Sequence, residues 1–140
     1  MSRILAIDYG KKRTGIAVTD PMQIIASGLT TVATHELFAF LERYLKSEDV
    51  ETIVIGEPKQ MDYTDSELGS VIHAFAKALQ EKYPHIIIER VDERFTSKMA
   101  FQTMIDSGLS KSKRRNKALV DEIAATIILQ TFMDKKSPFN

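Results

Sequence analysis

The sequence contains no cysteine among its 140 residues, which excludes disulfide bonds, thiolate metal sites and a cysteine nucleophile. It also carries no net charge at neutral pH, because 19 acidic residues balance 19 basic ones. Any binding of nucleic acid must therefore come from local basic clusters rather than from the overall field. No apolar run approaches the roughly 20 residues of a membrane helix, and the amino terminus lacks a signal-peptide pattern. The length predicts a single domain over residues 1–140, and these absences predict a cytoplasmic protein that has no membrane partner.

The first ordered segment organises the prediction of the fold. The apolar run Ile4–Ile7 is rich in strand formers and predicts a short buried strand. Gly10 and Gly15 bracket a basic turn, after which the strand pattern resumes, so a hairpin is expected. Asp8 ends the first strand, and because a buried unpaired carboxylate is costly, it must meet a cation, hydrogen-bond donors or solvent. Two interpretations remain open at this point: a carboxylate that caps a turn, or a metal ligand or catalytic acid presented on a rigid strand.

The rest of the chain alternates between strand and helix patterns. The expected elements are a strand at 24–32 with Gly28 as a bulge, a helix at about 35–47 capped by Thr34, a strand at 52–56, a helix at about 71–83, a strand at 86–91, a short helix that ends at Gly108, a basic loop at 110–117 and a helix at about 117–134 capped by Asn116. This order predicts an α/β fold with a five-stranded mixed sheet, in which three antiparallel strands precede two parallel strands and helices flank the sheet.

Carboxylates follow the strands that this topology makes parallel. Asp8 ends the first strand, Glu57 the fourth, and Asp92 and Glu93 the fifth, so all four are expected at one edge of the sheet. Asp121, near the start of the last helix, is carried toward the same edge, although alone it could merely complement the helix dipole. Converging carboxylates repel one another unless a cation intervenes. Mg²⁺ or Mn²⁺ suits such an all-oxygen site, and two such ions could activate a water for phosphodiester cleavage.

Basic residues near these acids predict contacts with phosphate, although in isolation each cluster is better explained as a solvated charged surface. The candidates are Lys11, Lys12, Arg13, Lys111, Lys113, Arg114, Arg115 and Lys117. Arg94 has two interpretations of its own, because its guanidinium could contact the scissile phosphate or could hold one of the acids in place.

The chain resembles a known family, and the likeness is carried by ordered motifs over nearly its whole length. These motifs are Asp8–Gly10, Arg13–Val18, Val54–Pro58, Asp92–Ser97 and Asp121–Leu129. The family is YqgF, also called RuvX, whose members are described as Holliday junction resolvases and as nucleases that process the 5′ end of pre-16S ribosomal RNA. The resemblance implies a ribonuclease H-like fold, with Asp8, Glu93 and Asp121 as catalytic, metal-binding acids.

One position departs from the family pattern. The resemblance implies an apolar residue in a Gly-Leu-Pro motif where this chain has Glu57. Because resolvases of the related RuvC type carry an acid on the fourth strand, Glu57 could be an additional metal ligand. It could instead be an exposed substitution that points away from the site, which is the favoured interpretation.

Three functions are consistent with these residues. The first is a Mg²⁺- or Mn²⁺-dependent endonuclease that matures the 5′ end of pre-16S ribosomal RNA. The second is a Holliday junction resolvase, which would need a symmetric dimer. The third is a nucleic-acid-binding module without catalysis. The expected partner is structured RNA or branched DNA, and the chain is expected to be a monomer or a homodimer. An actin-like ATPase half opens in a similar way, but the chain is too short for the second lobe.

Overall fold

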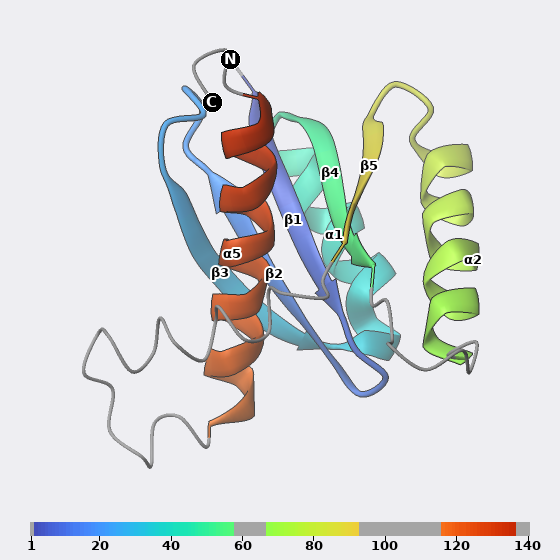
Figure 1. The fold of residues 1–140 in the computed structure, drawn as a ribbon. Coiled ribbons are helices and arrows are strands. Elements are labelled where there is room, and N and C mark those ends of the chain that lie inside the picture. Colours follow the sequence, from blue (N-terminus) through green and yellow to red (C-terminus); the bar gives the residue numbers. More distant parts are fainter. Residues whose placement is uncertain (1, 58–66, 93–115, 137–140) are drawn as a thin grey trace.

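The computed structural model describes residues 2–57, 67–92 and 116–136. Within these ranges five strands form one mixed sheet with the order β3-β2-β1-β4-β5, and helices cover it (Figure 1). The elements are β1 (Arg3–Tyr9), β2 (Arg13–Thr19), β3 (Ala26–Ala33), the 3₁₀ turn η1 (Thr34–Glu36), α1 (Leu37–Ser47), β4 (Val50–Glu57), α2 (Glu67–Lys82), β5 (Ile87–Asp92) and α5 (Lys117–Lys136).

The pairing of the strands confirms the predicted topology. β2 runs antiparallel to both β1 and β3, whereas β1, β4 and β5 run parallel to one another. The carboxyl ends of these three parallel strands therefore lie together, and α5 begins near the same end of the sheet (Figure 1). We call this side of the sheet, where β1 ends at Tyr9, β4 at Glu57 and β5 at Asp92, the carboxyl edge. Open α/β sheets commonly place their sites at such an edge.

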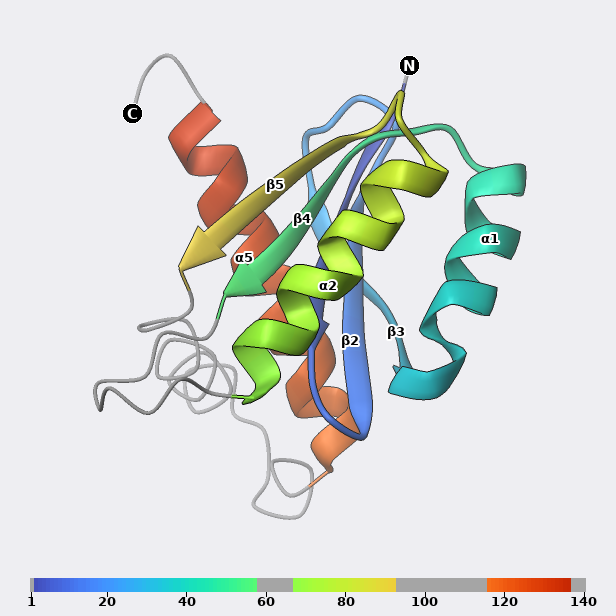
Figure 2. The same ribbon diagram turned by 90° about the vertical axis from the view of Figure 1, so that its right-hand side faces the viewer.

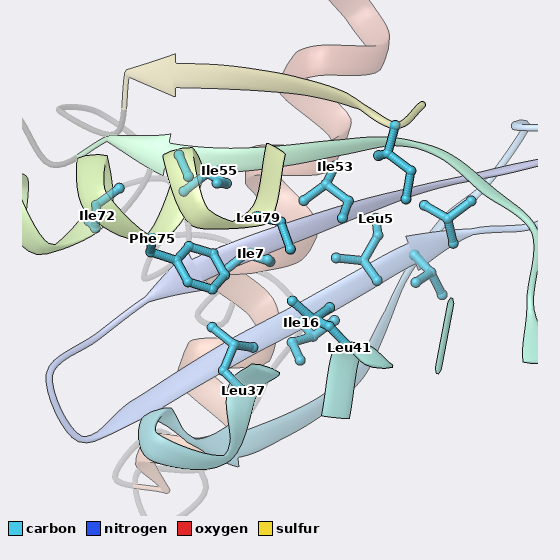
Figure 3. Packing of buried hydrophobic residues seen from close by; sticks show 14 residues of the cluster. Leu5, Ile7, Ile16, Leu37, Leu41, Ile53, Ile55, Ile72, Phe75 and Leu79 are labelled. Atoms are coloured by element: carbon cyan, nitrogen blue, oxygen red, sulfur yellow. The ribbon is translucent and has the colours of Figure 1, made fainter. Parts of the chain in front are cut away.

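The sheet is buried on both faces, which explains why β1 and β4 have continuous apolar runs. Helices α1 and α2 cover one face and α5 covers the other (Figure 2). Leu5 and Ile7 pack toward α1 and α2 (Figure 3), whereas Ile4 and Ala6 pack toward α5. This alternation follows from the period of two along a strand. It assigns every side chain of β1 and β4 to one face or the other.

The helix α5 lies close to the sheet because small residues line its buried side. Ala125 is fully buried in the cluster that joins α5 to β1, β2 and β4, and Ala124 is also buried. Ile128 and Leu129 follow one turn later and are fully buried as well. Burial of each such aliphatic side chain contributes about 1.5–3 kcal/mol. The predicted contact of Asp121's helix with the sheet through small residues is therefore confirmed.

Asn116 caps α5 as the sequence predicts. Its side-chain oxygen accepts hydrogen bonds from the backbone N–H groups of Ala118 (3.1 Å) and Leu119 (3.3 Å). The same first turn is tied to the sheet, because the Thr31 hydroxyl donates to the carbonyl of Ala118 (2.7 Å). The two bonds to Asn116 satisfy N–H groups that the start of a helix leaves without intrahelical partners, and the bond from Thr31 ties the same turn to β3. They fix the end of α5 that carries Asp121.

The predicted cap at Thr34 is wrong. No side chain caps η1 or α1, which begins only at Leu37. The Thr34 hydroxyl instead donates to the carbonyl of Gly10 (2.7 Å) and shares a hydrogen bond with the Thr14 hydroxyl (2.9 Å). Its backbone N–H donates to the carbonyl of Lys12 (3.0 Å). Thr34 therefore holds the turn between β1 and β2.

The strand β3 starts at Ala26, two residues later than predicted. Asp20 explains the difference, because its carboxylate accepts the backbone N–H groups of Ile25 (2.7 Å), Ile24 (2.8 Å) and Met22 (3.1 Å). These N–H groups are thereby engaged in the loop. The hydrogen bond from Ile25 contributes most to lowering the pKa of Asp20 below its ordinary value of 3.8.

The predicted bulge in β3 is present, because the β2–β3 register shifts between the pairs Ile16–Thr30 and Ala17–Gly28. The predicted short helix that ends at Gly108 lies outside the described residues, as does nearly all of the basic loop. None of the helices in the described ranges combines the length and apolar character that a membrane crossing would need. The single-domain organisation over residues 1–140 stays a prediction.

Candidate active site

Asp8 lies near the carboxyl edge of the sheet, on the face that α5 covers. It follows Ile4 and Ala6 in the alternation of β1, and both of those residues pack against α5. Asp8 is half-buried, and in the β1–β2 ladder it pairs with Gly15. The Cα atoms of such paired residues lie about 4.5–5.5 Å apart. Gly15 is therefore the nearest neighbour of Asp8 on β2.

Gly15 is also a point at which the backbone of α5 comes very close to the sheet. A Cβ atom added to Gly15 would lie 2.0 Å from the backbone oxygen of Asp121 and 3.0 Å from its Cβ. Only a residue without a side chain permits so close an approach. Asp8 and Asp121 thus both adjoin Gly15, one along the sheet and the other above it. Two of the acids that the sequence singled out come together there.

The turn between β1 and β2 presents Lys11 and Lys12, which are both exposed. A Cβ added to Gly10 would lie 2.4 Å from the backbone oxygen of Arg13, so the turn requires glycine at this position. The sequence placed Gly15 at the other end of the turn, but Gly15 lies within β2. The turn with its two lysines lies beside the end of β1 and is held by Thr34.

Arg13 makes an ion pair that the sequence did not predict. Its Nε donates to Oδ2 of Asp121 at 3.0 Å, and the two side chains are 40% and 21% exposed. The residues are 108 positions apart in the chain, so no local pattern could indicate their contact. The sequence had assigned Arg13 to phosphate binding. In the structure its guanidinium contacts a candidate metal ligand.

Glu57 ends β4 at the carboxyl edge, but on the other face of the sheet. It follows Ile53 and Ile55, which pack toward α1 and α2, so the alternation of β4 places it away from α5. Its carboxylate forms an ion pair with Arg90 of β5. The structure therefore does not bring Glu57 to the face that carries Asp8.

Tyr9 is adjacent to Asp8 in sequence, yet its side chain also lies on the α1–α2 face. Its ring packs against Phe75 of α2, with the ring centroids 5.2 Å apart. Burial raises the pKa of the Tyr9 phenol above 10.0. The phenol is therefore protonated at neutral pH and cannot serve there as a general base.

Two further candidates, Asp92 and Lys117, lie at the ends of described elements. Asp92 ends β5 and pairs with Glu57 in the β4–β5 ladder, and Lys117 is the first residue of α5. The predicted site residues that lie outside the described ranges are Glu93, Arg94, Lys111, Lys113, Arg114 and Arg115. Across the ranges 2–57, 67–92 and 116–136, no three side chains of His, Cys, Asp or Glu gather closely enough to hold a metal ion.

Sequence reasoning missed two features of this site. One is the ion pair between Arg13 and Asp121, and the other is the hydrogen bond from the Thr34 hydroxyl to the turn between β1 and β2. One signal for the close packing was present, because a glycine inside a strand pattern often marks the close approach of another backbone. Gly15 stands within the strand pattern that runs on to Val18. That signal indicates a contact but does not identify the helix that makes it.

Comparisons with known proteins agree with this architecture. The family model described as "RuvX: Holliday junction resolvase" matches residues 2–135. A protein of Flavobacterium psychrophilum named "Putative pre-16S rRNA nuclease" is 62% identical over 136 residues, covering 97% of this chain and 99% of that protein. A protein of Bacteroides fragilis with the same name is 59% identical over 136 residues, again covering 97% and 99%.

Among solved structures, the fold is similar to that of Thermus thermophilus RuvC. The structure described as "T. thermophilus RuvC in complex with Holliday junction substrate" superposes with a TM-score of 0.54 over 97% of both chains, at 16% identity. This likeness supports the ribonuclease H-like fold that the resemblance to the family implies. The match to the family model over residues 2–135 and the relatives at about 60% identity show that the chain belongs to the RuvX family.

Proposed function

We propose that this protein is a metal-dependent endonuclease that processes the 5′ end of pre-16S ribosomal RNA. One observation carries the proposal: Asp8 of β1 and Asp121 of α5 both adjoin Gly15 at the carboxyl edge. The name shared by relatives at about 60% identity supports the choice of substrate. The family model's description supports a phosphodiester bond as the target.

The chemistry of these acids fits a divalent cation. Asp8 and Asp121 offer carboxylate oxygens, which Mg²⁺ and Mn²⁺ prefer over nitrogen or sulfur ligands. We assign the third protein ligand to Glu93, and we leave Glu57 out because it lies on the other face of the sheet. Asp92, which pairs with Glu57 along the backbone, remains an additional candidate. A bound Mg²⁺ or Mn²⁺ would polarise the phosphoryl oxygen and generate the attacking hydroxide.

The basic residues position the substrate in this proposal. Lys11 and Lys12 extend from the turn that Thr34 holds beside the end of β1, so they can contact phosphates of a strand that passes the acids. The further phosphate contacts that we propose are Arg13, Arg94, Lys111, Lys113, Arg114, Arg115 and Lys117. Such contacts supply affinity that falls with salt, and they carry no sequence information. We also propose that the protein works in the cytoplasm.

A second function is kept because the family model carries the description of a Holliday junction resolvase. Symmetric cutting of a four-way junction needs two active sites related by a two-fold axis. This function therefore implies a homodimer on the junction, whereas trimming of one RNA strand can be done by a monomer. The oligomeric state and the substrate are thus linked predictions.

The test is cleavage of two labelled substrates side by side, a 5′-extended 16S precursor RNA and a four-way DNA junction. Each is incubated with Mg²⁺, with Mn²⁺ and with chelator. Asp8→Asn keeps the shape of the side chain and removes the charge, so we expect it to abolish cleavage and leave the circular dichroism spectrum unchanged. Glu57→Gln is the matched control, since it neutralises an acid at the same edge on the opposite face.

Metal-dependent RNA trimming that Asp8→Asn loses and Glu57→Gln keeps would support the proposal. Symmetric cutting of the junction, without RNA trimming, would replace it with the resolvase function. Undiminished cleavage by Asp8→Asn would refute the site. If the wild-type protein binds both substrates and cleaves neither, the chain is a nucleic-acid-binding module instead.

A further inference from the structure

The ion pair between Arg13 and Asp121 places a cation of the protein itself on a candidate metal ligand. Arg13 Nε lies 3.0 Å from Oδ2 of Asp121. The oxygens of an ionised carboxylate are the groups that a divalent cation would coordinate. A guanidinium and a metal ion that approach the same oxygen compete for it, and their like charges also repel each other.

The backbone around this pair has little freedom to relax. Asp121 rests on Gly15, and the first turn of α5 is fixed by Asn116 and Thr31. Arg13 starts β2 directly after the turn that Thr34 holds. If the backbone stays in place, the long Arg13 side chain is the part that can move, since it is 40% exposed and has several rotatable bonds. Its departure would not require the sheet or the helix to shift.

We infer that Arg13 is the internal counter-ion of Asp121, which neutralises this carboxylate before a metal binds and which the metal must displace. The inference rests on the proposed function, because it takes Asp121 to be a metal ligand. It assigns Arg13 a positioning role that precedes any contact with phosphate. The protein thereby keeps a partly buried carboxylate paired in the metal-free state, at the expense of some affinity for the metal.

The inference has a consequence whose sign is distinctive. Removing Arg13 should strengthen metal binding, because the competing cation is gone. Partly exposed ion pairs of this kind are weak, so the expected gain in affinity is roughly two- to fivefold. If Arg13 instead held Asp121 in the geometry that the metal needs, its removal would weaken metal binding. The two roles therefore predict opposite changes.

The experiment is a calorimetric titration of the full chain with MnCl₂ in the absence of nucleic acid. Arg13→Gln removes the charge, and Arg13→Lys keeps the charge but changes the donor geometry. Lys12→Gln is the matched control, because it removes one charge from the adjacent exposed position without touching Asp121. Thermal unfolding with chelator and with Mn²⁺ gives a second readout, since tighter binding to the folded state raises Tm further.

We expect Arg13→Gln to bind Mn²⁺ roughly two- to fivefold more tightly than wild type, with Arg13→Lys in between and Lys12→Gln close to wild type. Mn²⁺ should raise the Tm of Arg13→Gln more than that of wild type. Weaker Mn²⁺ binding by Arg13→Gln, or an equal gain in Lys12→Gln, would overturn the counter-ion role while leaving the metal site standing. If wild type binds no Mn²⁺, or Asp8→Asn binds it as tightly as wild type, the proposed site itself fails.

Discussion

Replacing Gly15 with alanine tests the contact on which the site depends. The added Cβ would lie 2.0 Å from the backbone oxygen of Asp121 and 2.3 Å from its carbonyl carbon. Ordinary van der Waals contact begins at 3.4 Å, so the start of α5 must move away from the sheet by about 1.4 Å. The obstacle is backbone, which cannot rotate out of the way as a long side chain can.

The expected cost follows from overpacking in a rigid core, which is typically about 1–3 kcal/mol. For a chain of this length, 1 kcal/mol corresponds to a change in Tm of roughly 3–4 °C, so Gly15→Ala should melt about 3–10 °C below wild type. Activity should suffer more, because a displacement of about 1 Å in a catalytic group can cost about 100-fold in rate. Asp121 is the residue that the displacement carries away from Asp8.

Gly28→Ala provides the matched control. Gly28 also lies under α5, but its added Cβ would meet Glu122 Cβ at 3.4 Å and Thr126 Oγ1 at 3.5 Å, which is ordinary contact. We expect its Tm to stay within about 3 °C of wild type, since removing a glycine also restricts the unfolded chain. The assays are thermal unfolding by circular dichroism and cleavage of the precursor RNA. A Gly15→Ala protein that melts and cleaves like Gly28→Ala would refute the close approach of α5.

Three further predictions concern Glu57, Thr34 and Asp20. Glu57→Leu should leave Mn²⁺ affinity and cleavage unchanged, because Glu57 lies on the face opposite Asp8; a measurable fall in either would make it a ligand. Thr34→Val loses the hydroxyl that bonds Gly10 and Thr14, so the free energy of unfolding in urea should fall by about 1–2 kcal/mol. An unchanged urea midpoint would show that these hydrogen bonds do not stabilise the turn. Asp20 has a lowered pKa in the folded state, so its contribution to stability is present above pH 3.8 and lost as the pH falls through the lower folded pKa. The Tm advantage of wild type over Asp20→Asn should therefore shrink below pH 3.8, and a gap that stays constant down to pH 2 would contradict this.

Much of the fold could be predicted because it depends on local patterns. The continuous apolar runs of β1 and β4 and the helical spacing of apolar residues in α1 and α2 can be read directly from the sequence. Asn116 is a cap whose partners lie two and three residues away. Thr34 stood in an equally suitable capping position, but its hydroxyl bonds Gly10, which is 24 residues away. Local chemistry made both caps plausible, and only tertiary structure distinguished them.

In the candidate site, too, local patterns could be predicted and tertiary contacts could not. The sequence could place Asp8 and Glu57 at one edge because both end parallel strands. The continuous apolar runs Ile4–Ile7 and Ile53–Ile55 could not assign the two acids to opposite faces, because strands that are buried on both sides lack a polar alternation. The resemblance to the family did favour a Glu57 that points away from the site. The faces become distinct only when α5 is known to cover Ile4 and Ala6. Arg13 and Asp121 are 108 residues apart in the chain, so no local sequence pattern indicates their ion pair.

The contact between Gly15 and Asp121 also makes the pair of carboxylates depend on the docking of α5. Asp8 belongs to the first strand, whereas Asp121 belongs to the helix that follows every strand of the sheet. Contacts between segments so far apart in sequence are slow to form, because a long loop must close before they contribute. A folding intermediate with a complete sheet and an undocked α5 would hold only half of the carboxylate pair. On the proposed function, a chain in that state would lack the complete site and would not cleave RNA.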